Sequence, residues 1–393
     1  MLMPEVAKEP VVSWQFLDIR SGHPMPALHG RTRSELFWAR NGIFQALGAL
    51  KTKQHAHILV PAYICSSAVD PIIAYGADVE FYRVDSDCKA DLTDIESRIR
   101  PETVALLIVH YFGAPQSIPA LRALCDRHGL WLLEDCAHVL VGAYEGAPLG
   151  SFGDVSVFSW RKFLPTYDGA TLFINRPFDE VRVSVRRESL LLSLQVLLNL
   201  LERWAERPGY RVRRLWRCLF NMLHGAREAI RKRPNEGAVP SSVDSNAGHF
   251  DAEMADLPMT RFSRAILRHS DVAAVSAARR SNYDYLHRAL ISIANVEPLW
   301  NSLPSGVTPW IFPLRVDQGA QGLAALRSAG IPAVSWSGVC PRTLLRQQFP
   351  EADRLYDHLL FLPLHQDLQR HDLDVMVCTI RSILGAPTRP DKC

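Results

Sequence analysis

Two residues in the first half of the chain have side chains that could carry out chemistry together. Lys162 follows an apolar run that ends at Ser159, and Asp135 follows an earlier apolar run at 130–133. Both runs have the length of buried strands. Parallel strands bring their carboxyl ends to one edge of a sheet, where open α/β sheets bind ligands. We therefore expect Lys162 and Asp135 to face the same site.

A lysine and a carboxylate at successive strand ends suit the chemistry of pyridoxal phosphate. That cofactor needs a lysine to form a Schiff base and move protons, and a carboxylate to keep its ring nitrogen protonated. Its phosphate needs amides and hydroxyls, and Gly42 begins a predicted helix where backbone amides can approach a phosphate. Taken singly, Lys162 would more often be a solvated lysine and Asp135 a helix cap, because short motifs carry little information.

A regular alternation of strands and helices positions these residues. The predicted strands are 57–60, 79–84, 105–109, 130–133, 155–159, 171–174 and 310–316, and the predicted helices include 43–47, 66–75, 91–99 and 118–128. Strands that alternate with helices at this spacing indicate a mostly parallel sheet covered on both faces. The fold class is therefore α/β.

The alternation also suggests four parts. Residues 1–35 are rich in Pro and Gly and are predicted to be an N-terminal arm, and residues 36–175 form the large, cofactor-binding domain. Residues 176–250 form an apolar and arginine-rich helical insertion, and residues 251–393 form a smaller C-terminal α+β domain.

The insertion contains an apolar helix around 190–201, and arginines flank it over 186–217. One interpretation is peripheral membrane contact, with apolar side chains among acyl chains and arginines at anionic headgroups. The other is packing against the protein body or a partner subunit. We expect packing, because apolar helices of this length mostly belong to protein cores.

Composition narrows the class of protein. The chain of 393 residues is 48% hydrophobic and 22% charged, with a net charge of +3, which is too small to imply nucleic acid as a partner. Its eight cysteines form no C-x-x-C pair and no zinc spacing with histidine, so we expect reduced thiols. The first residues lack the pattern of a signal peptide. These features predict a cytoplasmic enzyme.

Two other motifs suggest different chemistry. Asp85 and Asp87 have the D-x-D form of a metal and nucleotide-sugar site, but Asp commonly begins a turn after a strand. Cys136 and His138 resemble a nucleophile pair, but side chains two residues apart diverge. We therefore expect neither a metal site nor a cysteine nucleophile.

The order of short motifs resembles the DegT-type sugar aminotransferases of fold type I. The motifs that carry the resemblance are Val60-Pro61-Ala62-Tyr63, Tyr75-Gly76-Ala77-Asp78-Val79, His110-Tyr111-Phe112-Gly113, Glu134-Asp135-Cys136-Ala137-His138, Gly150-Ser151-Phe152-Gly153-Asp154, and Lys162 with Asp168-Gly169. Weaker matches at 254–385 extend it to most of the chain apart from the arm and the insertion. The resemblance implies a large domain with a mostly parallel sheet, a smaller C-terminal domain, and a homodimer.

The resemblance also assigns roles to the site residues. Lys162 would hold the cofactor and Asp135 its ring nitrogen, with His138 close to the ring. Ser159 would donate its hydroxyl to the phosphate. The residues whose backbone amides would also bind the phosphate are Gly42, Ile43 and Phe44.

The implied reaction transfers an amino group from glutamate or glutamine to a nucleotide-linked ketosugar, in amino-sugar and polysaccharide biosynthesis. One alternative is another pyridoxal-phosphate reaction on a sugar, such as dehydration, although the dehydrating relatives replace the lysine by histidine. The second is a catalytically inactive relative that acts as a scaffold in a membrane-associated polysaccharide complex.

The chain departs from the family at its cofactor contacts. Ile43 stands where the family usually has Thr, which removes a phosphate hydroxyl. Cys65 stands where many members stack an aromatic ring on the cofactor, for which Tyr63 is a candidate substitute. Asp256 aligns with the Asn that usually crosses from the partner subunit, so Asn246 or an arginine of the insertion would replace that contact.

The turn that carries the lysine also departs from the family. From Ser159 to Lys162 the chain is two residues shorter than the common form, so its local course should differ. Lys162 and Asp135 are both retained, and we therefore expect an active but divergent enzyme.

Overall fold

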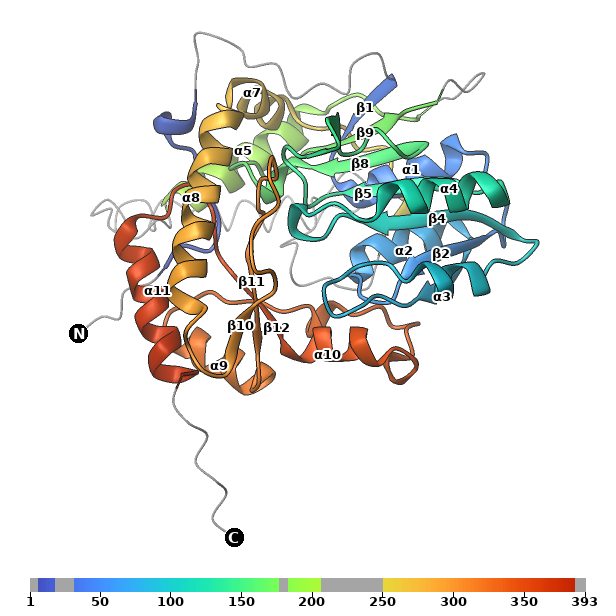
Figure 1. Cartoon of the computed structure of the whole chain (residues 1–393). Coiled ribbons are helices and arrows are strands. Elements are labelled where there is room, and N and C mark those ends of the chain that lie inside the picture. The colour runs from blue at the N-terminus through green and yellow to red at the C-terminus, as the bar shows by residue number, and fades with distance from the viewer. Residues whose placement is uncertain (1–5, 18–31, 177–182, 206–249, 386–393) are drawn as a thin grey trace.

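The computed structural model describes residues 6–17, 32–176, 183–205 and 250–385 (Figure 1). Its largest element is a seven-stranded sheet with the order β1-β9-β8-β5-β4-β2-β3. Neighbouring strands from β8 to β3 pair in parallel, and β9 pairs antiparallel with both of its neighbours. The strands are β1 (Thr32–Leu36), β2 (His57–Pro61), β3 (Asp78–Tyr82), β4 (Thr103–Val109), β5 (Trp131–Cys136), β8 (Val155–Ser159) and β9 (Ala170–Ile174).

Helices cover both faces of this sheet, which confirms the predicted α/β class (Figure 1). The four helices are α1 (Ala39–Ala49), α2 (Ser66–Tyr75), α3 (Leu92–Ser97) and α4 (Ile118–His128). Every residue of β2 and β8 is buried, because helices shield both faces of a parallel strand from water. Helices α2 and α4 end at Gly76 and Gly129, which adopt the left-handed conformation that glycine tolerates best.

A three-stranded antiparallel sheet forms the centre of the C-terminal part. Its order is β10-β11-β12, and α8 and α11 pack side by side against it (Figure 1). Its elements are α7 (Arg261–His269), α8 (Val272–Leu290), β10 (Val296–Pro298), β11 (Phe312–Val316), α9 (Gly319–Ser328), α10 (Pro350–His358), β12 (Leu359–Leu362) and α11 (Arg370–Ile383). A short hairpin of β6 (Ala143–Tyr144) and β7 (Ala147–Pro148) stands apart from both sheets.

The N-terminal residues correct one prediction. Thr32–Leu36, assigned mostly to an irregular arm, forms β1, which pairs antiparallel with β9 at the edge of the large sheet. Val6 is buried in the C-terminal core, and its amide donates to the carbonyl of Gly330 at 3.3 Å. Both contacts join segments that are far apart in the sequence, which local patterns do not reveal.

The apolar helix of the insertion, α5 (Leu190–Ala205), packs one face against the body, as expected. Leu192 and Val196 are 4% and 0% exposed and lie in a cluster with Phe37, Trp38 and Tyr167. The opposite face is open, with Leu190, Leu194 and Leu201 at 67%, 46% and 39% exposure. The arginines at 207–217 fall outside the described residues. In the part of the chain that the structure covers, no helix could span a bilayer.

We expect Leu192→Ala to lower the free energy of unfolding by about 2–4 kcal/mol, because it leaves a cavity under α5. Leu194→Ala removes the same atoms from a half-exposed position, so it should lower the free energy of unfolding by less than about 1 kcal/mol. Urea denaturation of the two variants measures the difference. Equal small losses, together with salt-sensitive binding to anionic vesicles that requires Arg211, Arg213 and Arg214, would favour the membrane interpretation.

Candidate active site

The carboxyl ends of β5 and β8 place Asp135 and Lys162 beside one cavity of about 560 Å³. Asp135 is the penultimate residue of β5. Lys162 ends a single 3-10 turn, Trp160–Lys162, that follows β8 directly. The parallel pairing of β5 with β8 brings these two strand ends to the same edge of the sheet. Asp135 and Lys162 therefore line one cavity, as the sequence predicts.

Lys162 is unusually easy to deprotonate for a lysine. Burial lowers the pKa of its ammonium to about 8, against the attraction of Asp135 and Cys65, and nearby Arg161 lowers it further. Its Nζ lies 4.4 Å from the centre of the Trp310 ring. A neutral amine is the nucleophilic form, so Lys162 is poised to attack a carbonyl carbon near neutral pH.

The buried position of Asp135 disfavours the charged form of its carboxyl group unless a cation lies close by. Burial raises the pKa of its carboxyl group, and Lys162, a hydrogen bond from the backbone and His110 oppose that shift. The backbone donor is the amide of Ala137, 2.9 Å from Oδ1. A positively charged ring N–H placed here would keep the carboxylate ionised, as a pyridine nitrogen requires.

His138 is a neutral hydrogen-bond donor in the cavity wall. Its ring stacks on Phe112 and Trp310, with centroids 5.7 and 4.3 Å away. Nδ1 accepts the Phe112 amide at 3.3 Å, so the proton of the neutral ring resides on Nε2. Burial, reinforced by Lys162, lowers its pKa well below the usual value, which keeps the ring neutral.

Arg279, on α8, ties the C-terminal part to the catalytic turn. The residue is 1% exposed, and its guanidinium donates to the carbonyls of Phe163 (3.1 Å) and Trp310 (2.8 Å) and to the side chain of Gln366 (3.0 Å). Phe163 follows Lys162 directly, so Arg279 fixes the lysine's turn and the facing Trp310 at once.

Sequence analysis did not identify Arg279 or Trp310 as site residues. A signal for Arg279 existed, because Val275, Tyr283 and Leu286 occupy the same helical face at positions four before, four after and seven after it. A lone arginine on an apolar face must satisfy its donors inside the protein. Trp310 gave no comparable signal, because it lies just before β11 and reaches the cavity only through tertiary packing.

The structure brings together six of the eight predicted site residues and leaves two outside. The residues that line the cavity are Lys162, Asp135, His138, Ser159, Cys65 and Ile43. Phe44 instead packs on Tyr75 and Phe250, with ring centroids 5.3 Å apart in each case.

Gly42 has a packing role rather than the predicted one. Helix α1 begins three residues earlier, at Ala39, and the Gly42 amide donates to the carbonyl of Trp38 at 3.3 Å. A Cβ at Gly42 would lie 2.8 Å from Val157, so the glycine allows α1 to approach β8. The start of α1 that lines the cavity is Trp38–Arg40, from the N-cap residue to the second residue of the helix.

The structure also shows where Tyr63 and Asp256 lie, two positions at which the chain differs from the family pattern. Tyr63 does not border the cavity; it is fully buried against Trp336, 4.9 Å between ring centroids. Asp256 forms an ion pair with Arg186, whose Nε lies 2.6 Å from the carboxylate, so its charge is compensated. Asn246 falls outside the described residues.

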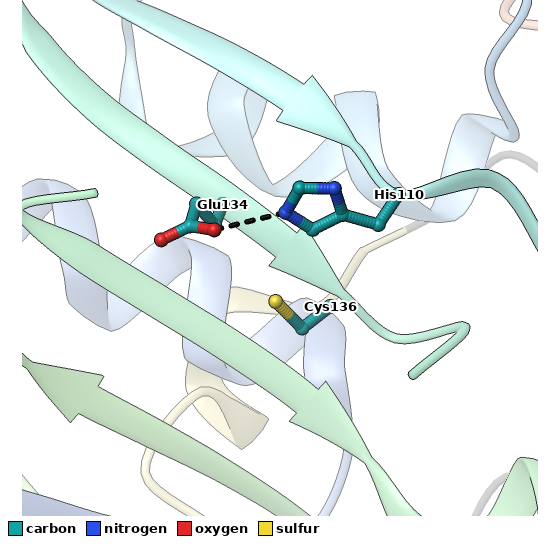
Figure 2. Close-up of side chains that lie close together, drawn as sticks. All are labelled: His110, Glu134 and Cys136. Atoms are coloured by element: carbon teal, nitrogen blue, oxygen red, sulfur yellow. Dashed lines mark hydrogen bonds and ion pairs between the residues drawn. The ribbon is translucent and has the colours of Figure 1, made fainter. Parts of the chain in front are cut away.

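Three buried residues, His110, Glu134 and Cys136, lie close together and have the residue types of a metal site (Figure 2). Two of them, His110 and Glu134, are held by hydrogen bonds within the protein. His110 Nε2 lies 2.9 Å from Glu134, and its Nδ1 accepts the Gln116 amide at 3.2 Å. The Glu134 carboxylate also accepts the amides of residues 150, 152 and 153. Glu134 thus holds the loop at 150–153 against β5.

The D-x-D motif likewise forms a turn. Oδ1 of Asp85 accepts the amides of Asp87 and Lys89, and Asp87 pairs with Arg315 at 2.6 Å. Its carboxylates are engaged by the protein.

Two solved structures with a similar architecture are aminotransferases. Helicobacter pylori PseC, an aminotransferase involved in the biosynthesis of pseudoaminic acid, matches 97% of this chain and 99% of its own, with a TM-score of 0.67 and 16% identity. The aminotransferase TlmJ from Streptoalloteichus hindustanus matches 90% of this chain and 85% of its own, with a TM-score of 0.62 and 20% identity. At these identities the likeness shows the fold, which is that of the fold-type-I sugar aminotransferases.

Curated relatives are more similar in sequence over a shorter stretch. GDP-perosamine synthase of Vibrio cholerae is 36% identical over 133 residues, 33% of this chain and 36% of the relative. The UDP-N-acetyl-3-dehydro-alpha-D-glucosamine 3-aminotransferase of Acidithiobacillus ferrooxidans is 33% identical over 121 residues, 30% of this chain and 33% of the relative. The matches thus span about a third of these relatives' length.

The stretch that matches a family model contains both Asp135 and Lys162. A family model described as the DegT/DnrJ/EryC1/StrS aminotransferase family matches residues 39–178. That range runs from the first turn of α1 to just past β9, and so includes the whole strand edge that carries the candidate site. The resemblance expected from the motifs is confirmed over residues 39–178, which match the model of the DegT/DnrJ/EryC1/StrS aminotransferase family.

Proposed function

We propose that the protein is a pyridoxal-phosphate-dependent aminotransferase that transfers an amino group from glutamate or glutamine to a nucleotide-linked ketosugar. The observation that carries the proposal is the pairing of Lys162 with Asp135 across one cavity at the sheet edge. The family domain and the names of the two curated relatives support a sugar substrate. We place the reaction in amino-sugar biosynthesis.

The residues present fit the cofactor. Asp135 would bind the ring nitrogen, Lys162 the aldehyde carbon, and Nε2 of His138 supplies a donor beside the ring. When bound, pyridoxal phosphate supplies an electron sink that allows a proton to leave the carbon bearing the amino group.

The chain's own groups would perform the proton transfers. A lysine whose pKa is about 8 can exist as a neutral amine at physiological pH, so Lys162 can accept a proton from the donor's Cα. Lys162 would pass that proton to the cofactor's aldehyde carbon. In the second half of the reaction it would take a proton back from that carbon and deliver it to the sugar carbon. The Arg279 contacts keep this lysine's turn in place while its charge changes.

The space around Lys162 is large enough for a cofactor and a sugar nucleotide. A second cavity of about 670 Å³ borders the first, and residues 8–10 line both. Arg203 and Arg327 line this second cavity, and Arg203 is paired with Glu9 at 2.9 Å. Phosphate oxygens suit the fork of an arginine, so we assign the nucleotide portion to the side of Arg327.

The proposal includes a homodimer in the cytoplasm. The homodimer follows from the family resemblance, and sedimentation velocity tests it. The described cysteines are free thiols, which agrees with a reducing compartment; they are Cys65, Cys88, Cys125, Cys136, Cys340 and Cys378.

The purified protein should develop a yellow absorbance band with pyridoxal phosphate, and glutamate should bleach that band. We then expect one member of a panel of UDP-, GDP- and dTDP-linked ketosugars to gain an amino group, detected by mass spectrometry. A protein that never turns yellow would support the scaffold alternative. A protein that turns yellow and dehydrates the sugar without aminating it would support the other pyridoxal-phosphate chemistry.

A further inference from the structure

One wall of the Lys162 cavity carries two additional positive charges. Arg40, in the first turn of α1, and Arg161, beside Lys162, both line it. Burial lowers the pKa of Arg40, and repulsion by Arg161 adds to this, against weaker opposition from Cys65 and Asp70. Two guanidinium groups brought together in a partly buried wall repel each other, and an anion between them removes that cost.

Two buried hydrogen-bond donors in the same wall have no acceptor among the described residues. They are Nε1 of Trp38 and Oγ of Ser66, and the two residues are 7% and 2% exposed. The guanidinium of Arg40 lies 4.8 Å from the centre of the Trp38 ring, so one orphaned donor is next to one of the charges. Buried donors are nearly always satisfied, and two orphans in one wall indicate a missing acceptor.

The backbone adds to the same wall. Helices α1 and α2 both begin there, and neither N-cap residue, Trp38 or Cys65, forms a side-chain cap. First-turn amides without a cap carry partial positive charge and bind anions. Ile43 lies in this wall too, and its side chain offers no hydrogen bond.

We propose that this wall is a phosphate site, in which Arg40 and Arg161 bind the phosphate of pyridoxal phosphate in place of the hydroxyl that Ile43 lacks. The inference rests on the proposed function and deepens it by assigning the cofactor's anchor to residues that the family pattern does not provide. A phosphate dianion takes several donors at once, and the planar fork of arginine supplies two of them in one contact.

The test compares pyridoxal phosphate with pyridoxal, which has the same aldehyde and lacks the phosphate. Arg40→Met and Arg161→Met should each weaken the binding of pyridoxal phosphate by about 10-fold or more, the scale of a lost charge-assisted contact. Binding of pyridoxal should stay within about 2-fold of the wild type. Arg354→Met, a change at a 73% exposed arginine on α10, serves as the matched control and should alter neither affinity.

The readout is the dissociation constant of each ligand, from titration of the absorbance band, with circular dichroism to check folding. Arg40→Lys keeps the charge without the fork and should give an intermediate affinity for pyridoxal phosphate, which covers the case that Arg40→Met does not fold. Equal losses for both ligands in Arg40→Met and Arg161→Met would indicate a structural role and overturn the inference.

A third ligand separates the cofactor's phosphate from the substrate's. Unchanged binding of pyridoxal phosphate with weakened binding of UDP or GDP would assign the wall to the diphosphate and overturn the inference. A wild-type protein that captures neither pyridoxal phosphate nor pyridoxal would overturn the proposed function itself. Normal capture with an unchanged ratio of the two affinities in both variants would overturn only the phosphate assignment.

Discussion

Lys162→Ala should abolish amino transfer, with a loss of about 10⁴-fold or more in kcat. The reason is that the change removes both the covalent attachment and the general base at once. Asp135 cannot replace it, because a buried carboxylate cannot form a Schiff base and is assigned to the ring nitrogen. Mass-spectrometric detection of the aminated sugar measures the loss. Retention of even a few per cent of the wild-type rate would refute the assignment.

Labelling identifies the lysine directly. Borohydride reduction of the wild-type complex should fix the cofactor on the peptide that contains Lys162. Lys89 provides a matched control, because burial also lowers its pKa but its ammonium donates to the carbonyl of Pro115, away from the cavity. Lys89→Ala should leave the labelling and the rate unchanged. Label on any other lysine would contradict the site.

The same lysine should set the pH dependence of cofactor capture. With a pKa of about 8, roughly a tenth of Lys162 is neutral at pH 7, compared with about one part in 3000 for an ordinary lysine. The capture rate should therefore rise with pH and level off above about pH 8. A rate still rising steeply at pH 10 would show that burial does not tune this amine.

Asp135→Asn should lower kcat by about 10²-fold or more and leave the protein folded. The amide cannot stabilise a protonated ring nitrogen, so the charge that develops at the donor's Cα loses its electron sink. Stability should hold, because burial raises the pKa of Asp135 and a neutral side chain avoids that desolvation cost. Steady-state kinetics and thermal denaturation together measure the two effects. Near-normal activity would exclude the electron-sink role.

Asp94→Asn is the matched control for Asp135→Asn. Asp94 has the same exposed fraction as Asp135, 9%, but its hydrogen bonds, including one from Arg98 at 2.7 Å, outweigh the effect of burial and hold the pKa of the carboxyl group below its usual value. Its charged form therefore contributes stability above the unfolded pKa, and that contribution is lost as the pH falls through the folded pKa. The Asn variant should lose stability at pH 7 and keep kcat. A rate loss in Asp94→Asn equal to that in Asp135→Asn would mean that general destabilisation explains both.

Local patterns in the sequence were enough to predict the parallel strands of the large sheet and the positions of Asp135 and Lys162 at their carboxyl ends. The runs at β2, β4, β5 and β8 are apolar and bounded by breakers, because both faces of a parallel strand are buried. Once those strands are recognised, their parallel order alone places Asp135 and Lys162 at one edge. A buried strand can be predicted in this way because its apolar residues are contiguous in the sequence.

Only the tertiary structure decided the rest of the site. The pairing of β1 with β9, the contact of Val6 with Gly330, and the donation from Arg279 to Trp310 and Phe163 all join segments more than 30 residues apart, so no local period announces them. Gly42 could be recognised as special from its type, but which strand it approaches depends on how α1 docks. The lowered pKa of Lys162 and the mutual repulsion of Arg40 and Arg161 arise because distant segments together exclude water from one cavity, and desolvation is a property of the packed molecule.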